Sequence, residues 1–343
     1  MADDLVQQLL DASGATANRD VLRDILRTAE GLAGDGADRL DLKITAAALK
    51  EMRAAFAMFA PLRDTPKVTI FGSARTHQDD PLYAQARNLA RVLADAGWFV
   101  ITGAGPGIMQ AGTEGAGRDH AIGVSIRLPF EEEPSELLAD GDRVVAMKYF
   151  FTRKLMLMKE SSAFVCLPGG FGTQDETFEL LTLMQTGKAS PAPVILLDVP
   201  GGTYWTRWTE YIDAELMTAG LVSPQDHELF QVTDDVDEAV AVVQRFWHSY
   251  HSIRWVGKRL VVRLRFEPTD AEVADLSERY ADLLVDGGIE RTDPLPAERS
   301  DRDNLDLHRI VMHYDARHAA RLRSLIDALN DLPSAAAGAG AVS

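Results

Sequence analysis

Residues 163–187 combine a glycine turn, a helix start and a carboxylate in an order that could bind a phosphorylated sugar. The apolar run 163–167 predicts a β-strand, and helical spacing of apolar residues resumes at about Thr173. The turn between them contains Gly169, Gly170 and Gly172. Such glycines let the backbone approach a ligand closely, and the helix N-terminus and the Thr173 hydroxyl offer hydrogen bonds to a phosphate. Glu176 cannot bind phosphate, so we expect it to hold sugar hydroxyls or to support positive charge on the sugar.

Two other predicted turns carry glycines at the edge of a sheet where doubly wound folds bind ligands. The first predicted strand ends at Gly72 and Ser73, and the stretch 102–109 contains Gly103, Gly105, Gly107 and Met109. Ordinary strand-to-helix turns are the alternative interpretation. The stretch 102–109 lacks the Gly-Lys-Ser/Thr of a P-loop, and no acidic residue is clearly placed to bind the ribose of NAD. Two glycine loops without these additions favour a mononucleotide.

Arg153 and Lys154 lie on a predicted helix just before the strand 163–167. Arg153 could point into the pocket, where its planar cation would pair with a phosphate or with Glu176. Adjacent cations are more often solvated on an exposed helix face. The residue types and spacing alone leave both interpretations open.

The string Pro-Gly-Gly-Phe-Gly-Thr-Gln-Asp-Glu at 168–176 resembles the PGGxGTxxE signature of the Lonely Guy (LOG) family. These phosphoribohydrolases split nucleoside 5′-monophosphates into a free base and ribose 5-phosphate, and several were mislabelled lysine decarboxylases. Matching positions run from about 67 through 244 and include 103–109, 128–130 and 183–187. LOG proteins also carry an Arg-Lys pair at this spacing before the signature. No feature of the sequence identifies the lysine that a pyridoxal phosphate enzyme requires.

The resemblance implies that Arg153 and Glu176 are catalytic, and that the substrate is AMP or an N6-modified AMP such as a cytokinin riboside monophosphate. The expected substrate-binding residues are Gly72, Ser73, Gly103, Gly105, Gly107, Met109, Lys154, Gly169, Gly170, Gly172, Thr173 and Thr182. As in glycoside hydrolysis, a carboxylate would stabilise a cationic sugar. A second acidic group could come from Glu131, Glu132 or Glu133, and the sequence does not choose among them. No cofactor is expected.

Two positions depart from the longer bacterial members of the family. Ala104 stands where the second glycine of Gly-Gly-Gly-Pro-Gly is usual, and Gly112 stands where an Asn is usual. The hydrogen bond of that Asn would be missing, so the base preference stays open. The alternative function is a non-catalytic nucleotide-binding or molybdenum-cofactor carrier protein of Rossmann-like fold. Arg153 and Glu176 together favour the enzyme, because a phosphate carrier needs no carboxylate beside its anion.

Alternating strands and helices predict an α/β fold, a Rossmann-like doubly wound parallel sheet. Its predicted strands are 67–72, 98–102, 121–126, 162–167 and 193–198, and its helices are 82–96, 107–118, 149–160, 173–187, 204–217 and 234–249. We expect N-terminal helices in 1–63, the catalytic domain in 64–249, a small α+β domain in 250–332 and a disordered tail in 333–343. In the α+β domain, strands are expected at 259–266 and 308–314, helices at 270–285 and 316–330, and a loop at 292–304.

The helix that follows Thr173 spreads apolar side chains over a wider stripe than one sheet could cover. These side chains are Phe178, Leu180, Leu181, Leu183 and Met184. LOG-type proteins pair through this region. The resemblance therefore implies at least a homodimer with this helix at or near the subunit contact.

Composition and residue spacing indicate which partners, metal sites and cellular compartment to expect. A formal charge of −17 and a pI near 4.9 oppose a broad nucleic-acid-binding surface. Cys166, the only cysteine, lies in an apolar strand and should be a buried structural thiol. The sequence shows no signal pattern or membrane-length apolar run, so we expect a soluble cytoplasmic protein without a membrane partner. His308, His313 and His318 recur at a spacing that does not bring them to one face, so no metal site is expected.

Overall fold

The computed structural model describes residues 2–127 and 141–340 and divides into two compact units, Met1–Phe56 and Ala57–Ser343. The first unit contains α1 (Ala2–Ala12), α2 (Arg19–Gly34) and most of α3 (Arg39–Phe59), as predicted. Val6 and Leu10 of α1 are buried, whereas no residue of α2 is buried in the described structure. The Arg23 guanidinium of α2 donates a hydrogen bond to the Gln7 side chain, 3.1 Å away. This unit therefore buries little apolar surface of its own.

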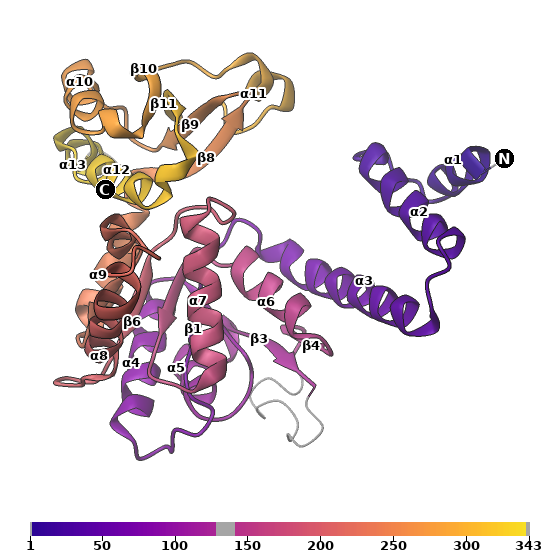
Figure 1. Cartoon of the computed structure of the whole chain (residues 1–343), viewed down its shortest axis with the longest axis horizontal. Coiled ribbons are helices and arrows are strands. Elements are labelled where there is room, and N and C mark those ends of the chain that lie inside the picture. Colours follow the sequence, from indigo (N-terminus) through magenta and orange to yellow (C-terminus); the bar gives the residue numbers. More distant parts are fainter. Residues whose placement is uncertain (1, 128–140, 341–343) are drawn as a thin grey trace. The chain divides into compact units, whose positions relative to one another are not determined.

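In the described part of the second unit, seven parallel strands form the central sheet (Figure 1). Their order is β4-β3-β2-β1-β5-β6-β7. The strands are β1 (Lys67–Phe71), β2 (Phe99–Thr102), β3 (Ala121–Ile126), β4 (Val144–Met147), β5 (Ala163–Cys166), β6 (Val194–Leu197) and β7 (Gln231–Thr233). This is the predicted Rossmann-like sheet. The sequence pattern predicts the five inner strands and misses β4 and β7, because edge strands are short and only partly buried.

Helices cover both faces of the central sheet. α4 (Pro81–Asp95), α5 (Ile108–His120) and α9 (Val236–Phe246) pack with Val68 and Ile70 of β1 in one core cluster. Thr69 points the other way, and its hydroxyl donates to the Leu157 carbonyl in α6 (Phe150–Lys159), 3.3 Å away. α7 (Phe171–Gln185) is joined to α6 by ion pairs on this second face. The alternation of side chains along β1 thus decides which helices cover which face.

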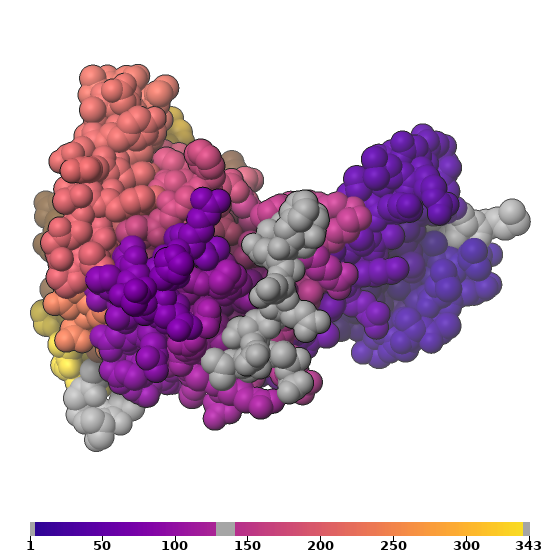
Figure 2. Space-filling view, turned by 90° about the horizontal axis from the view of Figure 1, so that it is seen from below, coloured from indigo at the N-terminus to yellow at the C-terminus, as the bar shows by residue number. Residues whose placement is uncertain are grey.

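The loops that follow β6 and β7 close against α4. The Gln85 amide donates to the carbonyls of Asp198 and Asp234, 3.0 Å and 2.9 Å away. In Figure 2 the purple surface around α4 adjoins the salmon surface of residues that follow β6. α8 (Tyr204–Tyr211) then continues as a π-helical segment, Ile212–Met217, so the predicted helix 204–217 is present with a change of winding.

Residues after 249 form a small α+β subdomain around an antiparallel sheet of order β10-β11-β9-β8. Its elements are β8 (Tyr250–Val256), β9 (Arg259–Leu264), α10 (Asp270–Arg279), β10 (Leu284–Arg291), α11 (Pro296–Asp301), β11 (His308–Tyr314), α12 (Ala319–Asn330) and α13 (Pro333–Gly340). The predicted strands at 259–266 and 308–314 correspond to β9 and β11. The prediction of one helix over 270–285 is wrong in its last residues, because α10 ends at Arg279 and β10 begins at Leu284.

Two segments predicted to lack structure are helical instead. In the predicted loop 292–304, α11 forms around Glu298, which is fully buried and accepts hydrogen bonds from Arg263 and Arg309 at 2.7 Å and 3.3 Å. In the predicted tail, Pro333–Gly340 forms α13 and buries Ala335, while 341–343 lie outside the described residues. Long-range partners order both segments, and local composition does not reveal such partners.

α12 holds the subdomain to the central sheet. The Arg323 guanidinium donates to the Ala192 carbonyl, 3.0 Å away, and the Asn330 side-chain carbonyl accepts from the amides of Ser249 and Tyr250, both at 2.8 Å. These bonds join the chain segments on either side of the subdomain boundary. None of the helices in the described ranges is both long and apolar enough to cross a bilayer.

Candidate active site

Three loops meet at the carboxyl ends of β1, β2 and β5. The Ser73 amide donates to the Pro168 carbonyl at 3.3 Å, and the Ile108 amide donates to the Ser73 carbonyl at 3.0 Å. At β1 the strand order reverses, because β2 to β4 extend to one side and β5 to β7 to the other. Doubly wound folds bind ligands in the crevice at such a switch point. The fold therefore brings the predicted glycine loops together at the expected edge.

Gly107 and Gly169 permit the close approach of these loops. Gly107 has φ 67°, and a Cβ there would lie 2.3 Å from the Ser73 carbonyl oxygen. A Cβ at Gly169 would lie 2.1 Å from Thr173 Oγ1 and 3.0 Å from the Ser73 amide nitrogen. Any larger residue at either position would separate the loops. These glycines thus serve the packing of the site as well as any ligand.

Gly103 lies directly against the predicted catalytic arginine. A Cβ on Gly103 would stand 2.0 Å from Arg153 Nη2 and 2.5 Å from the Met109 sulfur. Gly105 also faces Met109, whose methyl carbon would lie 2.7 Å from an added Cβ. The loop 102–109 therefore forms one wall around the Arg153 guanidinium.

The remaining glycines of the site differ in how closely other atoms surround them. Gly72 packs on the Ile108 side chain, 2.5 Å from the position of a Cβ. Gly170 and Gly172 have no described atom within 4 Å of that position, so they face open space. Gly170 precedes the first turn of α7, where the N–H groups have no partner within the helix. An anion could approach the backbone most closely at these two residues.

Arg153 extends from α6 toward α7, and its side chain is only 9% exposed. Its Nε donates to the Val124 carbonyl of β3, 3.0 Å away. Its Nη1 lies 3.6 Å from Glu176 Oε1 on α7. Arg153 thus points inward, as the family resemblance implies, and not into solvent as adjacent cations more often do. Contacts from two other elements orient the plane of the guanidinium.

Glu176 lies one turn into α7 with a side chain that is 13% exposed. Burial raises the pKa of its carboxyl, while the nearby charges of Arg153 and then Lys154 act in the opposite direction. A carboxylate removed from water interacts strongly with a developing positive charge, because little solvent screens it. The position of Glu176 therefore suits a group that stabilises a cationic sugar or binds sugar hydroxyls.

Lys154 turns away from Arg153 along α7. Its ammonium pairs with Asp175 at 2.7 Å and with Glu179 at 2.6 Å. Burial lowers the pKa of Lys154, but the hydrogen bonds to these two carboxylates outweigh burial, and the pKa is raised overall. Lys154 thus fixes α6 against α7, which helps to hold Arg153 opposite Glu176.

Other predicted site residues are placed less centrally. Thr182 lies six residues beyond Glu176 on α7, roughly 9 Å further along the helix axis, and lines a separate apolar pocket with Phe178 and Trp208. Glu131, Glu132 and Glu133 lie outside the described residues, as does the segment 128–130.

Tyr204 belongs to the site, although no sequence signal singles it out. Its hydroxyl donates to the Gly169 carbonyl at 2.7 Å, and the Gln174 side chain donates to that hydroxyl at 2.5 Å. Buried Asp198 accepts hydrogen bonds from the Tyr204 amide at 2.9 Å and the Val199 amide at 2.8 Å. The loop after β6 therefore holds the glycine turn in place.

The two departures from the longer bacterial pattern have distinct structural settings. Ala104 adopts φ 56°, a left-handed conformation that explains why glycine is suited to this position. Its methyl group is buried in the core cluster, which offsets part of the strain. Gly112 packs tightly on the sheet, where a Cβ would lie 3.0 Å from the Thr102 methyl carbon. An Asn side chain would not fit this backbone unless Thr102 moved.

Gly103→Ala should lower turnover by roughly 10-fold or more, because the new methyl group displaces Arg153 from its position opposite Glu176. Steady-state kinetics with circular dichroism and thermal melting would separate lost alignment from lost folding. Gly34→Ala is a matched control, since a Cβ at Gly34 meets no described atom within 4 Å. Normal turnover in a folded Gly103→Ala protein would contradict this assignment.

Cys166 and the three C-terminal histidines lie outside this chemistry. Burial raises the pKa of the Cys166 thiol to about 12, so it is not a nucleophile at neutral pH. His308, His313 and His318 each lie beside a different carboxylate. Within the described residues, no group of three or more His, Cys, Asp or Glu side chains could hold a metal ion.

Comparisons with known proteins identify similar chains. A family model described as "possible lysine decarboxylase" matches residues 106–243. A cytokinin riboside 5′-monophosphate phosphoribohydrolase of Arabidopsis thaliana is 31% identical over 141 residues, which are 41% of this chain and 62% of that protein. The enzyme of the same name from Mycobacterium marinum is 28% identical over 172 residues, 49% of this chain and 87% of that protein. This chain thus spans about three fifths of the Arabidopsis relative.

A solved structure, the molybdenum cofactor carrier protein of Chlamydomonas reinhardtii, is 23% identical with a TM-score of 0.38, and the match covers 53% of this chain and 97% of that one. The phosphoribohydrolase from Mycobacterium tuberculosis is 27% identical over 168 residues, 48% of this chain and 86% of that protein. The signature at 168–176 forms the turn and first helical turn beside Arg153. The signature and the phosphoribohydrolase relatives together make this chain similar to the LOG family.

Proposed function

We propose that this protein hydrolyses the N-glycosidic bond of a nucleoside 5′-monophosphate to a free base and ribose 5-phosphate. The proposed substrate is AMP or an N6-modified AMP, such as a cytokinin riboside monophosphate. The observation that carries the proposal is the buried pair of Arg153 and Glu176 beside three glycine loops at the switch point of the sheet. The relatives named for this reaction support it.

Each part of the site has a role in this proposal. The phosphate binds at the start of α7, where Gly170 and Gly172 face open space and helix N–H groups attract an anion. Glu176 holds ribose hydroxyls and stabilises positive charge as the bond between C1′ and the base nitrogen breaks. The base leaves with the bonding electrons and takes up a proton, while water adds to C1′. Arg153 orients the nucleotide and assists departure of the base.

Incubation of the purified protein with AMP, GMP, CMP, UMP and isopentenyl-AMP tests this proposal directly. Ribose 5-phosphate should be released from AMP, isopentenyl-AMP or both, and the ranking would give the base preference. Release from none of the nucleotides, with nucleotide binding retained, would instead support a carrier without catalytic activity. Binding is therefore measured in parallel by calorimetry.

We predict that turnover needs no divalent metal. The signature at 168–176 lacks the P-loop arrangement of Lys, Ser/Thr and a separate Asp that holds Mg²⁺. The rate of ribose 5-phosphate release should stay the same after treatment with EDTA and removal of the chelator. Loss of activity that added Mg²⁺ or Mn²⁺ restores would refute this prediction.

We also predict at least a homodimer, with α7 at or near the subunit contact. Phe171 at the start of α7 is 97% exposed, and Phe151 and Leu155 are exposed one turn apart on the neighbouring α6. Exposed apolar side chains of this size are typical of association surfaces. Light scattering coupled to size exclusion should give twice the chain mass or more, and Phe151→Glu should shift it toward the monomer. A fully active wild-type monomer at micromolar concentration would rule the dimer out.

A further inference from the structure

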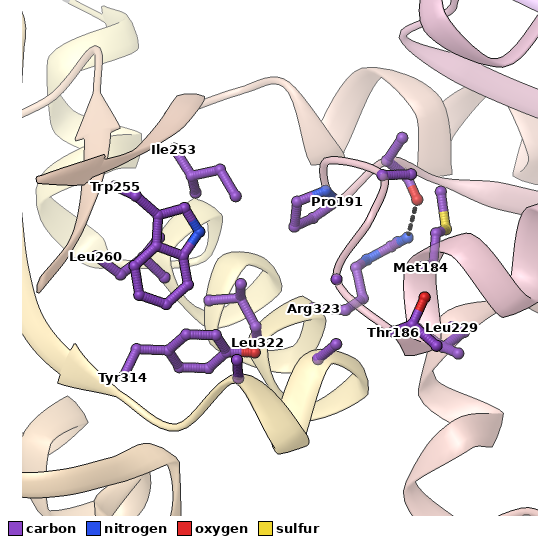
Figure 3. A pocket seen from close by; sticks show the side chains of 15 residues that line it. Met184, Thr186, Pro191, Leu229, Ile253, Trp255, Leu260, Tyr314, Leu322 and Arg323 are labelled. Carbon is purple, nitrogen blue, oxygen red and sulfur yellow. Dashed lines mark hydrogen bonds between the residues drawn. The ribbon is translucent and has the colours of Figure 1, made fainter. Parts of the chain in front are cut away.

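A cavity separates the C-terminal end of α7 from the sheet of the α+β subdomain. It encloses about 70 Å³ within a recess of about 590 Å³ that opens to solvent. One wall is formed by Ile253, Trp255, Leu260, Tyr314 and Leu322 of the subdomain, and the other by Met184, Thr186, Pro191, Ala192 and Leu229 (Figure 3). None of these residues belongs to the candidate active site. The enclosed space is smaller than the roughly 300–1,000 Å³ of ordinary small-molecule sites, so it suits a ligand no larger than about one ring.

Two aromatic rings give this cavity a surface suited to a flat molecule. The ring centroids of Trp255 and Tyr314 are 5.8 Å apart, and the ring planes are inclined by 45°. Trp255 remains 47% exposed although it belongs to a strand of the subdomain sheet. Figure 3 shows both side chains directed toward the interior of the ring of lining residues. An aromatic ligand would pack against both rings and the aliphatic side chains around them.

The Tyr314 hydroxyl provides the polar feature of this cavity. It is buried and has no hydrogen-bond partner among the residues that the structure describes. In Figure 3 the hydroxyl points away from the strand and toward Leu322. Burial raises the pKa of Tyr314, so the hydroxyl stays protonated and can donate. Buried hydroxyl groups are normally paired, and a ligand in the cavity would supply the missing partner.

The charge of the lining residues indicates an uncharged ligand. Arg323 is the one ionisable side chain with a permanent charge among the residues that line the cavity. Its Nε donates to Asp327 at 3.0 Å, its Nη1 donates to the Ala192 carbonyl at 3.0 Å, and its guanidinium lies over the Phe246 ring at 4.5 Å. The positive charge is therefore compensated within the protein. The one cation that lines the cavity is already paired with a carboxylate, so an anionic ligand would gain no free cation there.

We propose that this cavity is a binding site for a small, uncharged aromatic molecule that carries one hydrogen-bonding group. The rings of Trp255 and Tyr314 hold its flat face, and the Tyr314 hydroxyl bonds its polar group. The site goes beyond the proposed nucleotide hydrolysis and does not depend on it. Its test uses direct binding to the full chain, so failure of the hydrolase proposal would leave it unaffected.

Phenol, benzene and benzoate are suitable probes, because they share one ring and differ in the polar group. Calorimetry and saturation-transfer NMR should show saturable binding of phenol to the wild-type chain, roughly 2- to 10-fold tighter than benzene, as expected for one added hydrogen bond. Benzoate should bind more weakly than either. In Tyr314→Phe, which keeps the ring, the preference for phenol over benzene should disappear.

Ala316→Phe is the blocking variant. Ala316 lines the cavity but is exposed, so a larger side chain there should fill the recess without disturbing the core. It should abolish binding of phenol and benzene while thermal melting stays close to wild type. Absence of saturable phenol binding to the wild-type chain would overturn the proposal. Equal phenol binding by the wild-type, Tyr314→Phe and Ala316→Phe proteins would place the molecule elsewhere and overturn it as well.

Discussion

Glu176→Gln should lower the rate of nucleotide hydrolysis by roughly 100-fold or more while the fold and the nucleotide affinity change little. Glutamine keeps the size of the side chain and its ability to bind a sugar hydroxyl, but it removes the negative charge. In a site this buried, the charge interacts with the cationic transition state through little solvent. The loss should therefore appear in kcat rather than in KM.

Glu179→Gln is the matched control for this variant. Glu179 lies on the same helix, is 39% exposed, and pairs with Lys154, which keeps Asp175 as a second partner. Because the remaining ion pair with Asp175 still holds Lys154 against α7, the rate should remain within roughly threefold of wild type. A near-normal rate in Glu176→Gln would remove Glu176 from the mechanism. Equal losses in both variants would point to a general effect of charge on α7.

The pH dependence of the rate tests independently whether Glu176 must be ionised. Its carboxyl must be ionised to stabilise positive charge, and burial raises its pKa. The rate should therefore fall as the pH drops through a value above the ordinary pKa of a glutamate. The residual activity of Glu176→Gln should lack this acidic limb, because that side chain does not titrate.

Arg153→Ala should lower both turnover and nucleotide affinity. The guanidinium is fixed by the Val124 carbonyl and lies opposite Glu176, so its removal takes away the group that orients the nucleotide. Arg153 also lowers the pKa of Glu176, and without it that pKa should rise further. The acidic limb of the pH profile should then move to higher pH. Rate assays and calorimetry with AMP would measure these effects.

Arg153→Lys should not restore activity, because an ammonium cannot donate to Val124 and face Glu176 with the same planar geometry. Lys159→Ala on the same helix is the control, since Lys159 is half exposed and pairs with Glu160. In Arg153→Ala with Glu176→Gln, the loss should be smaller than the product of the single losses, because the two residues act together. Unchanged affinity and rate in Arg153→Ala would exclude it from the site.

Local patterns in the sequence determined the inner strands and the position of the glycine turns. Buried parallel strands such as β5 are continuous apolar runs, and glycines followed by a helix mark the turns that bind phosphate. The signature at 168–176 likewise carries the resemblance to the LOG family, because it is a contiguous string. Each of these features depends on residues that are adjacent in the chain, so the order of the residues is enough to predict it.

The tertiary structure alone decided the partners of each side chain. Arg153 points inward because of Val124, 29 residues earlier, and Glu176 on another helix. Adjacent Lys154 turns instead to Asp175 and Glu179. Nothing in the local spacing distinguishes these two cations, because their environments come from elements far apart in the sequence.

The same reason explains the features that the sequence did not reveal. Tyr204 reaches the glycine turn because its loop packs beside β5, and α11 forms because Glu298 meets two buried arginines. The cavity beside Tyr314 exists because a separate subdomain packs against α7. Contacts between distant segments depend on how the sheets and helices pack together. The hydrophobic periodicity of a single segment therefore does not predict them.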